Sequence, residues 1–179
     1  MYCEVTVGFI AQLPDNQLSG SSQWDNFHGY ERSRLHTMSD GGYTGAWVSG
    51  SYSIGQFIQA DLGTVRRVEK IATQGRDNYY DQWVTSYKFA YSADGITYSY
   101  ILNLDGSERV FTGNNDRNTV VEHVLDTAVA ARYVRAHPQT WREAMSMRWE
   151  VYGCDIGKIL LTLPTSVCSL PLKTASNSV

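Results

Sequence analysis

Short runs in which apolar and polar residues alternate recur along the chain, and no segment keeps a helical period over three turns. Alternation of this kind places one face of an extended strand against a core and the other toward solvent. The run from Met145 to Tyr152 is the cleanest, and it predicts a half-buried strand. Turn clusters at 40–42, 62–64 and 113–116 divide the chain, so the sequence predicts an all-β sandwich or barrel. The other strand-like runs are Phe57–Leu62, Val68–Thr73, Val84–Ser92, Ile96–Leu102, Thr119–Leu125 and Tyr133–His137.

The segment from Ala72 to Gly95 combines a strand, a turn and a tyrosine-rich polar stretch. Within it, the run Val84–Ser92 has aromatic residues at alternate positions, which predicts a strand with one aromatic face. Asp94-Gly95 then predicts a hairpin with a two-residue turn. The stretch Arg76–Asp81 has no periodicity that would bury it, so its two tyrosines are expected in a loop. This combination is typical of a scaffold for binding loops rather than of an active site.

Length and charge limit the classes of protein to be considered. A chain of 179 residues fits one ordinary domain with a short extension. Its 15 basic and 18 acidic residues give a net charge of −3 with no basic run, which argues against nucleic acid as a partner. The four histidines belong to no metal or catalytic motif, so we expect no enzyme activity.

The cysteines suggest where the domain begins and ends. Cys3 and Cys154 enclose nearly every periodic segment, as expected if a disulfide joins the two ends of one domain. Such a bond implies an oxidising compartment, whereas two buried thiols in a cytosolic protein are the alternative. Beyond Cys154 the composition changes, so we expect a domain over 1–154 and a tail or linker over 155–179, which contains the third cysteine, Cys168.

A series of short motifs follows in order between Cys3 and Cys154. They include Leu13-Pro14-Asp15-Asn16-Gln17-Leu18, Phe57-Ile58-Gln59-Ala60-Asp61-Leu62-Gly63, Tyr91-Ser92-Ala93-Asp94-Gly95, Ala131-Arg132-Tyr133-Val134-Arg135 and Arg148-Trp149-Glu150-Val151-Tyr152-Gly153-Cys154. In this order they resemble the discoidin domain, also called the coagulation factor V/VIII (F5/8) type C domain. The resemblance implies a distorted jelly-roll barrel of antiparallel strands, closed by a Cys3–Cys154 disulfide. It also implies an extracellular, non-catalytic binding module for cell adhesion or cell-surface recognition.

By the same resemblance, three loops at one end of the barrel bind the ligand. We name them loop 1 (21–30), loop 2 (39–56) and loop 3 (76–82). At least one of the two large apolar rings in loop 1 is expected to be exposed, and Trp47 is expected in the packed base of loop 2. The candidate ligand-binding residues are Trp24, Asp25, Asn26, Phe27 and His28 in loop 1, Tyr43 and Tyr52 in loop 2, and Arg76, Tyr79 and Tyr80 in loop 3.

The composition of these loops favours a cell-surface glycan or protein as the partner. Tyrosine among Ser, Gly, Asn and Asp is also the mixture that antibody binding loops use. The loops contain one fixed cation, Arg76, whereas a phosphatidylserine-binding surface would gather Lys and Arg. Binding to an anionic phospholipid membrane is therefore the alternative, and a carbohydrate-targeting module of a larger enzyme is another. The acidic residues in the loops are Asp25, Asp40, Asp77 and Asp81.

No cofactor is expected, except that Asp77 and Asp81 could hold Ca²⁺. They lie four residues apart in a loop that also contains Asn78, and Ca²⁺ prefers such oxygen ligands. Solvated loop carboxylates are the other interpretation of the same two residues.

Overall fold

The structure is a computed structural model that describes Cys3 and residues 6–156. These residues form strands and short 3-10 helices without any α-helix, which confirms the expected all-β class. None of these helices is long and apolar enough to span a membrane. Apart from Asp155 and Ile156, the predicted tail lies outside the described residues, as does Cys168. The elements are β1 (Val7–Gly8), η1 (Ile10–Gln12), η2 (Asp15–Gln17), β2 (Leu18–Gly20), η3 (Tyr30–Ser33), β3 (Trp47–Val48), β4 (Ile58–Gln74), β5 (Trp83–Ser92), β6 (Ser99–Tyr100), β7 (Val110–Thr112), β8 (Val121–Arg142) and β9 (Ser146–Asp155).

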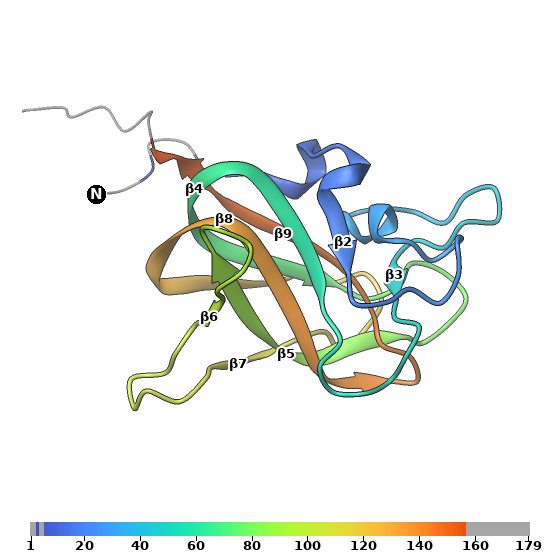
Figure 1. Cartoon of the computed structure of the whole chain (residues 1–179). Coiled ribbons are helices and arrows are strands. Elements are labelled where there is room, and N and C mark those ends of the chain that lie inside the picture. The colour runs from blue at the N-terminus through green and yellow to red at the C-terminus, as the bar shows by residue number, and fades with distance from the viewer. Residues whose placement is uncertain (1–2, 4–5, 157–179) are drawn as a thin grey trace, which may run out of the picture.

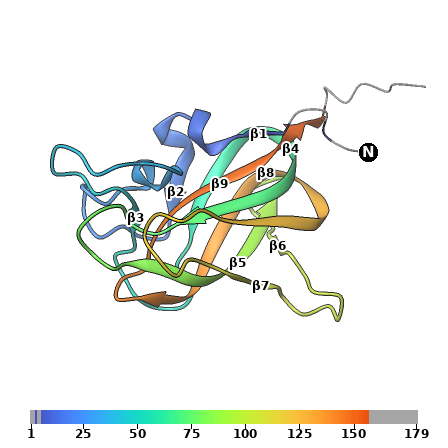
Figure 2. The ribbon, with the colours of Figure 1, turned by 180° about the vertical axis from the view of Figure 1, so that it is seen from behind.

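The strands form one antiparallel sheet that curves around a common core (Figures 1 and 2). The main path through the sheet runs β1-β9-β4-β8-β5-β6, with β2 paired to β4, β3 to β9 and β7 to β5. The longest strands, β4 and β8, pair with each other and are central in this order. This arrangement confirms the barrel-like jelly-roll architecture that the resemblance implied.

One turn expected from the sequence lies inside a strand. β4 joins the predicted runs Phe57–Leu62 and Val68–Thr73 into one strand, so the prediction of two strands was wrong. The pairing with β8 shifts register between Asp61 and Arg66, where Gly63 has a φ of +78°. Such a bulge bends a long strand around the barrel without ending it, which explains why a turn-like sequence occurs there. β8 joins the two later runs in the same way.

The hairpin after β5 exists, but its loop is longer than predicted. Tyr91 pairs with Ser99, so the loop includes everything between those residues rather than two. The carboxylate of Asp94 stabilises the loop by accepting hydrogen bonds from the backbone N–H groups of Ile96 (2.8 Å) and Thr97 (2.9 Å). An aspartate that bonds the backbone two residues ahead makes a turn by itself, so Asp-Gly did not require the two-residue form.

β9 is buried on both faces, whereas the sequence predicted a half-buried strand. Its polar residues Arg148 and Glu150 have exposed fractions of only 1% and 3%. Glu150 accepts hydrogen bonds from the backbone N–H groups of Ile10 (2.6 Å) and Ala11 (2.8 Å), which begin η1. Burial raises the pKa of the Glu150 carboxyl. The alternation in β9 therefore separates an apolar core from a buried polar layer, rather than core from solvent.

The predicted disulfide between Cys3 and Cys154 is confirmed, with the two Cα atoms 5.6 Å apart. It joins the segment before β1 to the end of β9, which lies at the opposite end of the barrel from loops 1 to 3 (Figure 2). Closing a loop of this length stabilises a fold by roughly 3–5 kcal/mol in the chain-entropy model. The largest buried side chains of the core include Trp47, Trp149, Tyr87, Phe89 and Phe111.

Candidate functional site

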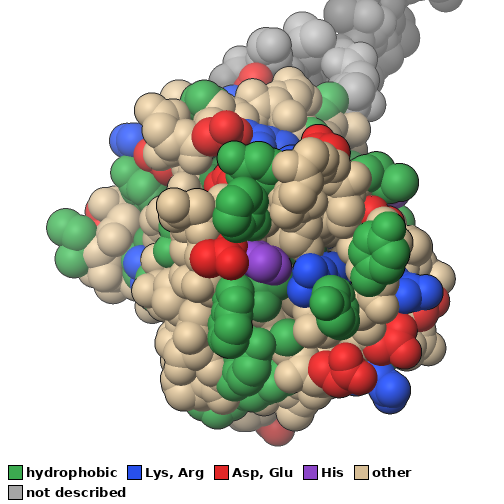
Figure 3. Space-filling view, turned by 90° about the vertical axis from the view of Figure 1, so that its right-hand side faces the viewer, with side chains coloured by type: hydrophobic (Ala, Val, Ile, Leu, Met, Phe, Trp, Pro, Cys, Tyr) green, Lys and Arg blue, Asp and Glu red, His purple; other side chains and the backbone are tan. Residues whose placement is uncertain are grey.

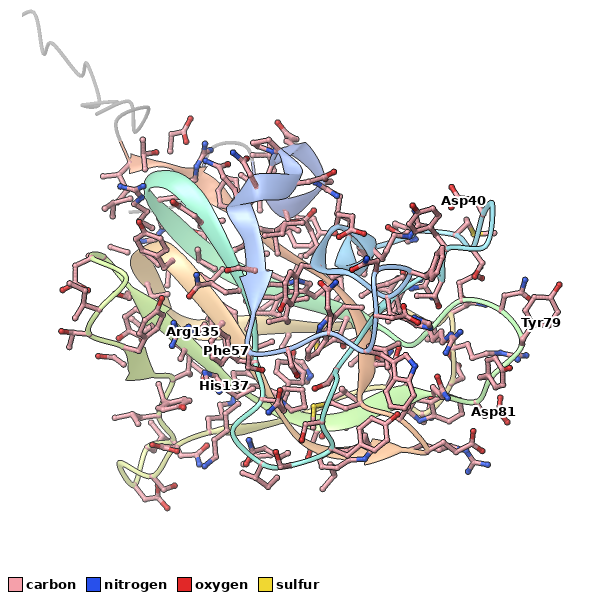
Figure 4. All side chains as sticks on the ribbon, turned by 45° about the vertical axis from the view of Figure 1, so that its right-hand side comes forward. Asp40, Phe57, Tyr79, Asp81, Arg135 and His137 are labelled. Atoms are coloured by element: carbon pink, nitrogen blue, oxygen red, sulfur yellow. A yellow bond between two sulfur atoms is a disulfide. The ribbon has the colours of Figure 1, made fainter. Side chains whose placement is uncertain are left out.

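Loops 1, 2 and 3 lie together at one end of the barrel, as the resemblance implied (Figures 1 and 4). Backbone hydrogen bonds connect loop 2 to both of its neighbours. Thr44 N–H donates to the carbonyl of Phe27 in loop 1 at 3.0 Å, and Asp77 N–H of loop 3 donates to the carbonyl of Gly45 at 3.1 Å. Tyr79 is at the outermost tip of loop 3 (Figure 4). We call this end of the molecule the loop end.

Buried Arg148 of β9 ties the bases of these loops to the barrel. Its guanidinium donates hydrogen bonds to the backbone carbonyls of Gly75 (2.7 Å), Thr37 (2.9 Å) and Arg117 (2.8 Å), and to Oδ1 of Asn118 (2.8 Å). These acceptors belong to the segments before loops 2 and 3 and to the loop between β7 and β8. One side chain therefore fixes three segments that are distant in sequence. Burial lowers the pKa of Arg148.

Trp47 belongs to the packed base of loop 2, as the sequence predicted. Its side chain is fully buried, and its indole Nε1 donates a hydrogen bond of 2.9 Å to the carbonyl of Ser22. It therefore supports loop 1 from below and does not face a ligand.

Six aromatic side chains at the loop end are exposed, which confirms the expectation for loop 1. Trp24 stacks on Tyr52 with ring centroids 6.3 Å apart, and Phe27 lies 5.3 Å from Tyr43. Tyr79 makes no ring contact with any other described residue. The exposed fractions are 58% for Trp24, 49% for Phe27, 43% for Tyr43 and Tyr52, 83% for Tyr79 and 54% for Tyr80.

An Asp–His pair lies among these rings. His28 Nδ1 and Asp25 Oδ1 are 2.6 Å apart, and the same oxygen accepts the Phe27 N–H at 2.8 Å. The hydrogen bond from His28 is the main cause that lowers the pKa of the Asp25 carboxyl. Figure 3 shows this end directly, with hydrophobic side chains around a histidine that has acidic and basic groups on either side. Asn26 is exposed at the tip of the same loop.

Arg76 lies beside this pair, half-buried between the loops. One of its terminal nitrogens donates to Gln82 Oε1 at 2.6 Å, and its guanidinium lies 4.7 Å from the Tyr80 ring centroid. Burial lowers the pKa of Arg76, while the nearby Tyr80, Tyr52 and Asp25 act in the opposite direction. Its Nε is buried without a partner among the described residues. The structure therefore brings together candidate residues from all three loops.

The two aspartates predicted as calcium ligands lie in different environments. Asp77 is only 7% exposed, and its carboxylate accepts the Ser39 N–H at 3.0 Å. Asp81 is half exposed, with its carboxylate 3.7 Å from the Arg117 guanidinium. Within residues 6–156 and Cys3, no group of three or more His, Cys, Asp or Glu side chains could hold a metal ion. Calcium binding stays a prediction that titration must test.

The charge count made from the loops was incomplete, because arginines outside them reach the loop end. Arg32 forms an ion pair with Asp40 at 3.0 Å, and Arg117 is the neighbour of Asp81 described above. With Asp77 buried and Asp25 paired to a histidine, the acidic residues of the loops do not form an uncompensated negative surface. The count of a single cation in the loops therefore understates the positive charge at the loop end.

A cleft beside the loop end is lined by residues outside loops 1 to 3. It has a volume of about 680 Å³ and lies between the loop-end termini of β5 and β8 and the β7–β8 loop. Trp83, Trp141, Asn115 and Arg142 line it. The sequence shows the pair Trp141-Arg142. Its position relative to the loops, however, depends on the register between β5 and β8, which the sequence does not reveal.

Another cluster of aromatic residues with a histidine lies on the side of the barrel. His137 packs between Phe57 and Tyr100, with ring centroids 5.5 and 5.4 Å away, and the guanidinium of Arg135 lies 4.1 Å from the Phe57 ring centroid. Burial, followed by the charge of Arg135, lowers the pKa of His137 to about 4. Figure 4 shows Phe57, Arg135 and His137 away from the loop end.

Comparison with known proteins identifies the domain. The F5/8 type C domain model matches residues 17–151. Mouse lactadherin is 37% identical over 148 residues, covering 79% of this chain and 31% of lactadherin. Discoidin-1 of Dictyostelium discoideum is 43% identical over 107 residues, covering 60% of this chain and 40% of that protein. The chain therefore spans less than half the length of these curated relatives.

Solved structures give the same result. Discoidin II of Dictyostelium discoideum superposes with a TM-score of 0.74 at 30% identity, covering 85% of this chain and 60% of that chain. A family 32 carbohydrate-binding module of C. perfringens, solved in complex with galactose, has a TM-score of 0.59 at 17% identity and covers 83% of this chain and 99% of its own; it shows the fold alone. The chain belongs to the F5/8 type C, or discoidin, domain family.

Proposed function

We propose that this discoidin-type binding module works outside the cell in adhesion or recognition, and that its loop end binds a cell-surface glycan. The disulfide between Cys3 and Cys154 supports an oxidising compartment. A carbohydrate-binding module with the same fold makes a sugar ligand compatible with this architecture, although a fold by itself does not choose a ligand.

The observation on which this proposal rests is the environment of Arg76. Of the five N–H donors of a guanidinium, one is bonded to Gln82 in the described structure. The group is half-buried beside Asp25 and between exposed tyrosines, so its position is set before a ligand arrives. A buried or half-buried donor without enough partners gains most from a ligand that supplies acceptors.

The neighbouring residues suit the rest of a sugar. The Asp25 carboxylate can accept hydrogen bonds from hydroxyl groups, and its contact with His28 Nδ1 leaves the other ring nitrogen for the ligand. The exposed faces of Trp24 and Tyr52 can pack against the C–H groups of a sugar ring. A site with a few converging polar groups and aromatic walls is typical of small polar ligands.

A glycan array with the described domain tests this proposal. We expect Arg76→Met and His28→Ala to weaken binding by roughly 10- to 100-fold, because a hydrogen bond to a charged group contributes about 1.5–3 kcal/mol. Arg109→Met is the matched control, since Arg109 pairs with exposed Asp126 far from the loops. If no glycan binds, or if the two loop variants bind as tightly as wild type, the proposal is wrong. Thermal unfolding of each variant shows whether it has folded.

An anionic membrane is the second candidate, because Trp24 and Phe27 are exposed together on loop 1. Burying both rings in a bilayer would contribute roughly 3–6 kcal/mol at about 1.5–3 per side chain. The arginines at this end do not strengthen that candidate, since Arg32 and Arg117 are already beside carboxylates. Binding to phosphatidylserine vesicles that is lost on Trp24→Ala with Phe27→Ala, but kept on Arg76→Met, would favour the membrane.

Two further alternatives concern the partner and the whole protein. A protein ligand would use the same exposed tyrosines, and immobilised collagen in the same screen tests one such ligand. A hydrolase domain encoded in the full-length gene would indicate that this module directs an enzyme to carbohydrate.

A further inference from the structure

The cleft beside the loop end has the size and lining of a ligand site. Its volume of about 680 Å³ falls within the range of ~300–1,000 Å³ that small-molecule sites occupy. Half-buried Trp141 provides aromatic surface, Trp83 is only 8% exposed, and no acidic residue lines the cleft. The guanidinium of Arg142 lies 5.4 Å from the Trp83 ring centroid. The side chains of Asn115 and Arg142 have no hydrogen-bond partner among the residues that the structure describes.

The walls of the cleft are held in place before any ligand binds. Gly113 N–H donates to the Thr85 carbonyl and Asn114 N–H donates to the Val84 carbonyl, each at 2.8 Å. The side-chain amide of Asn114 donates to the Thr119 carbonyl at 2.8 Å. These bonds use the β5 carbonyls that face the cleft, so a peptide could not add there as an extra strand through them. Side chains, rather than backbone, would recognise the occupant.

Aromatic rings connect the loop end to this cleft. Tyr52 lies 6.3 Å from Trp24 on one side and 6.5 Å from Trp141 on the other, measured between ring centroids. Trp141 in turn lines the cleft. We call Trp24, Tyr52 and Trp141 the aromatic track. The track begins beside Asp25 and Arg76. It ends in the cleft, where the Asn115 amide and the Arg142 guanidinium are available to bond a ligand.

We propose that the ligand is an oligosaccharide, with its terminal sugar at Arg76 and His28 and its following sugars along the aromatic track in the cleft. This inference rests on the proposed glycan function and adds the extent of the ligand. Successive sugar rings present C–H faces to aromatic rings, and their hydroxyls can both donate and accept hydrogen bonds. Asn115 offers both an amide donor and a carbonyl acceptor, and Arg142 offers donors.

The test compares long and short sugars that share the same terminal residue. Galacto-, gluco- and N-acetylglucosamine oligosaccharides of increasing length are screened on an array, and the bound series is measured by calorimetry. Wild-type affinity should rise with length by roughly two- to tenfold for each added ring contact. Arg142→Met and Asn115→Ala should remove that gain and leave the affinity for the shortest sugar unchanged. Trp141→Leu should also remove the gain, and because Trp141 contacts Tyr52 it should weaken binding of the shortest sugar as well. Arg109→Met is the matched control for the arginine, and unfolding curves check Trp141→Leu, which is half-buried.

The possible results distinguish a failure of the cleft inference from a failure of the proposed glycan function. If the long and short sugars bind equally and both depend on Arg76, the cleft is not part of the site and the inference fails while the proposed function stands. If wild type binds no sugar in any series, both fail together. If the cleft variants weaken binding to immobilised collagen but to no sugar, the occupant is a protein and the inference is overturned.

Discussion

Replacing Arg148 by methionine should destabilise the domain by about 3–5 kcal/mol, because four neutral oxygen acceptors lose a charged hydrogen-bond donor. The side chain is 1% exposed and donates to three backbone carbonyls and one side-chain oxygen. Each buried acceptor left without a donor costs about 1–3 kcal/mol. The costs do not simply add, because the substitution also removes a buried charge whose desolvation opposes folding, as the lowered pKa of Arg148 indicates.

Urea denaturation measures this difference, and the slope of the transition should not change. A domain stability of roughly 5–15 kcal/mol leaves the variant largely folded. Hydrogen exchange should become faster in the segments that Arg148 connects, around Thr37, Gly75 and Arg117. These segments support the loops, so glycan affinity should fall as well.

Arg109→Met is the control substitution. It removes one ion pair with Asp126, whose side chain is 80% exposed, and a contact of the guanidinium with the Phe111 ring at 4.7 Å, and should cost less than about 2 kcal/mol. If Arg148→Met costs no more than Arg109→Met, then the hydrogen bonds of Arg148 do not hold the loops, and the reasoning is refuted.

Three further predictions concern titration and the disulfide. The imidazole of His137 should titrate near pH 4 in an NMR experiment, whereas the same residue in the unfolded chain binds a proton near pH 6.5. The free energy of unfolding should therefore fall as the pH drops from 6.5 toward 4, and His137→Asn should abolish that part of the pH dependence. A titration midpoint near 6.5 would contradict the packing of His137 between Phe57 and Tyr100. His28→Ala should raise the pKa of Asp25 toward 3.8 in a carboxyl NMR titration, and an unchanged value would show that the pair does not exist in solution. Cys3→Ser with Cys154→Ser should lower the free energy of unfolding by roughly 3–5 kcal/mol in denaturant, and an unchanged midpoint would show that the bond does not form.

Strand periodicity predicted the class of fold, and the family resemblance carried by the ordered motifs predicted the end of the barrel that displays the loops. The prediction from sequence failed where the same local pattern is compatible with two different structures. Gly63 looks like a turn but bends a continuous strand, and Glu150 looks solvent-facing but binds the backbone of η1. Nothing in the neighbouring residues distinguishes these cases, because the deciding partner is distant in the chain.

Only part of the candidate site at the loop end could be predicted from the sequence. The exposed rings of loop 1 could be predicted from composition, and the structure agrees. The ion pair of Arg32 with Asp40 and the placement of Trp141 next to Tyr52 could not, because each joins residues from different elements. The neutralising arginines lie outside the loops in the sequence, and no sequence motif marks the cleft.

The disulfide and the end of β9 lie at the far end of the barrel from the loops (Figure 2). A bead, a fluorophore or a second copy of the domain joined after β9 would therefore leave the loops unobstructed. Two copies tethered in this way would face a surface side by side, and a single contact that is too weak to persist could become durable, since linked sites can gain roughly 10²–10⁴ in avidity without any new interaction.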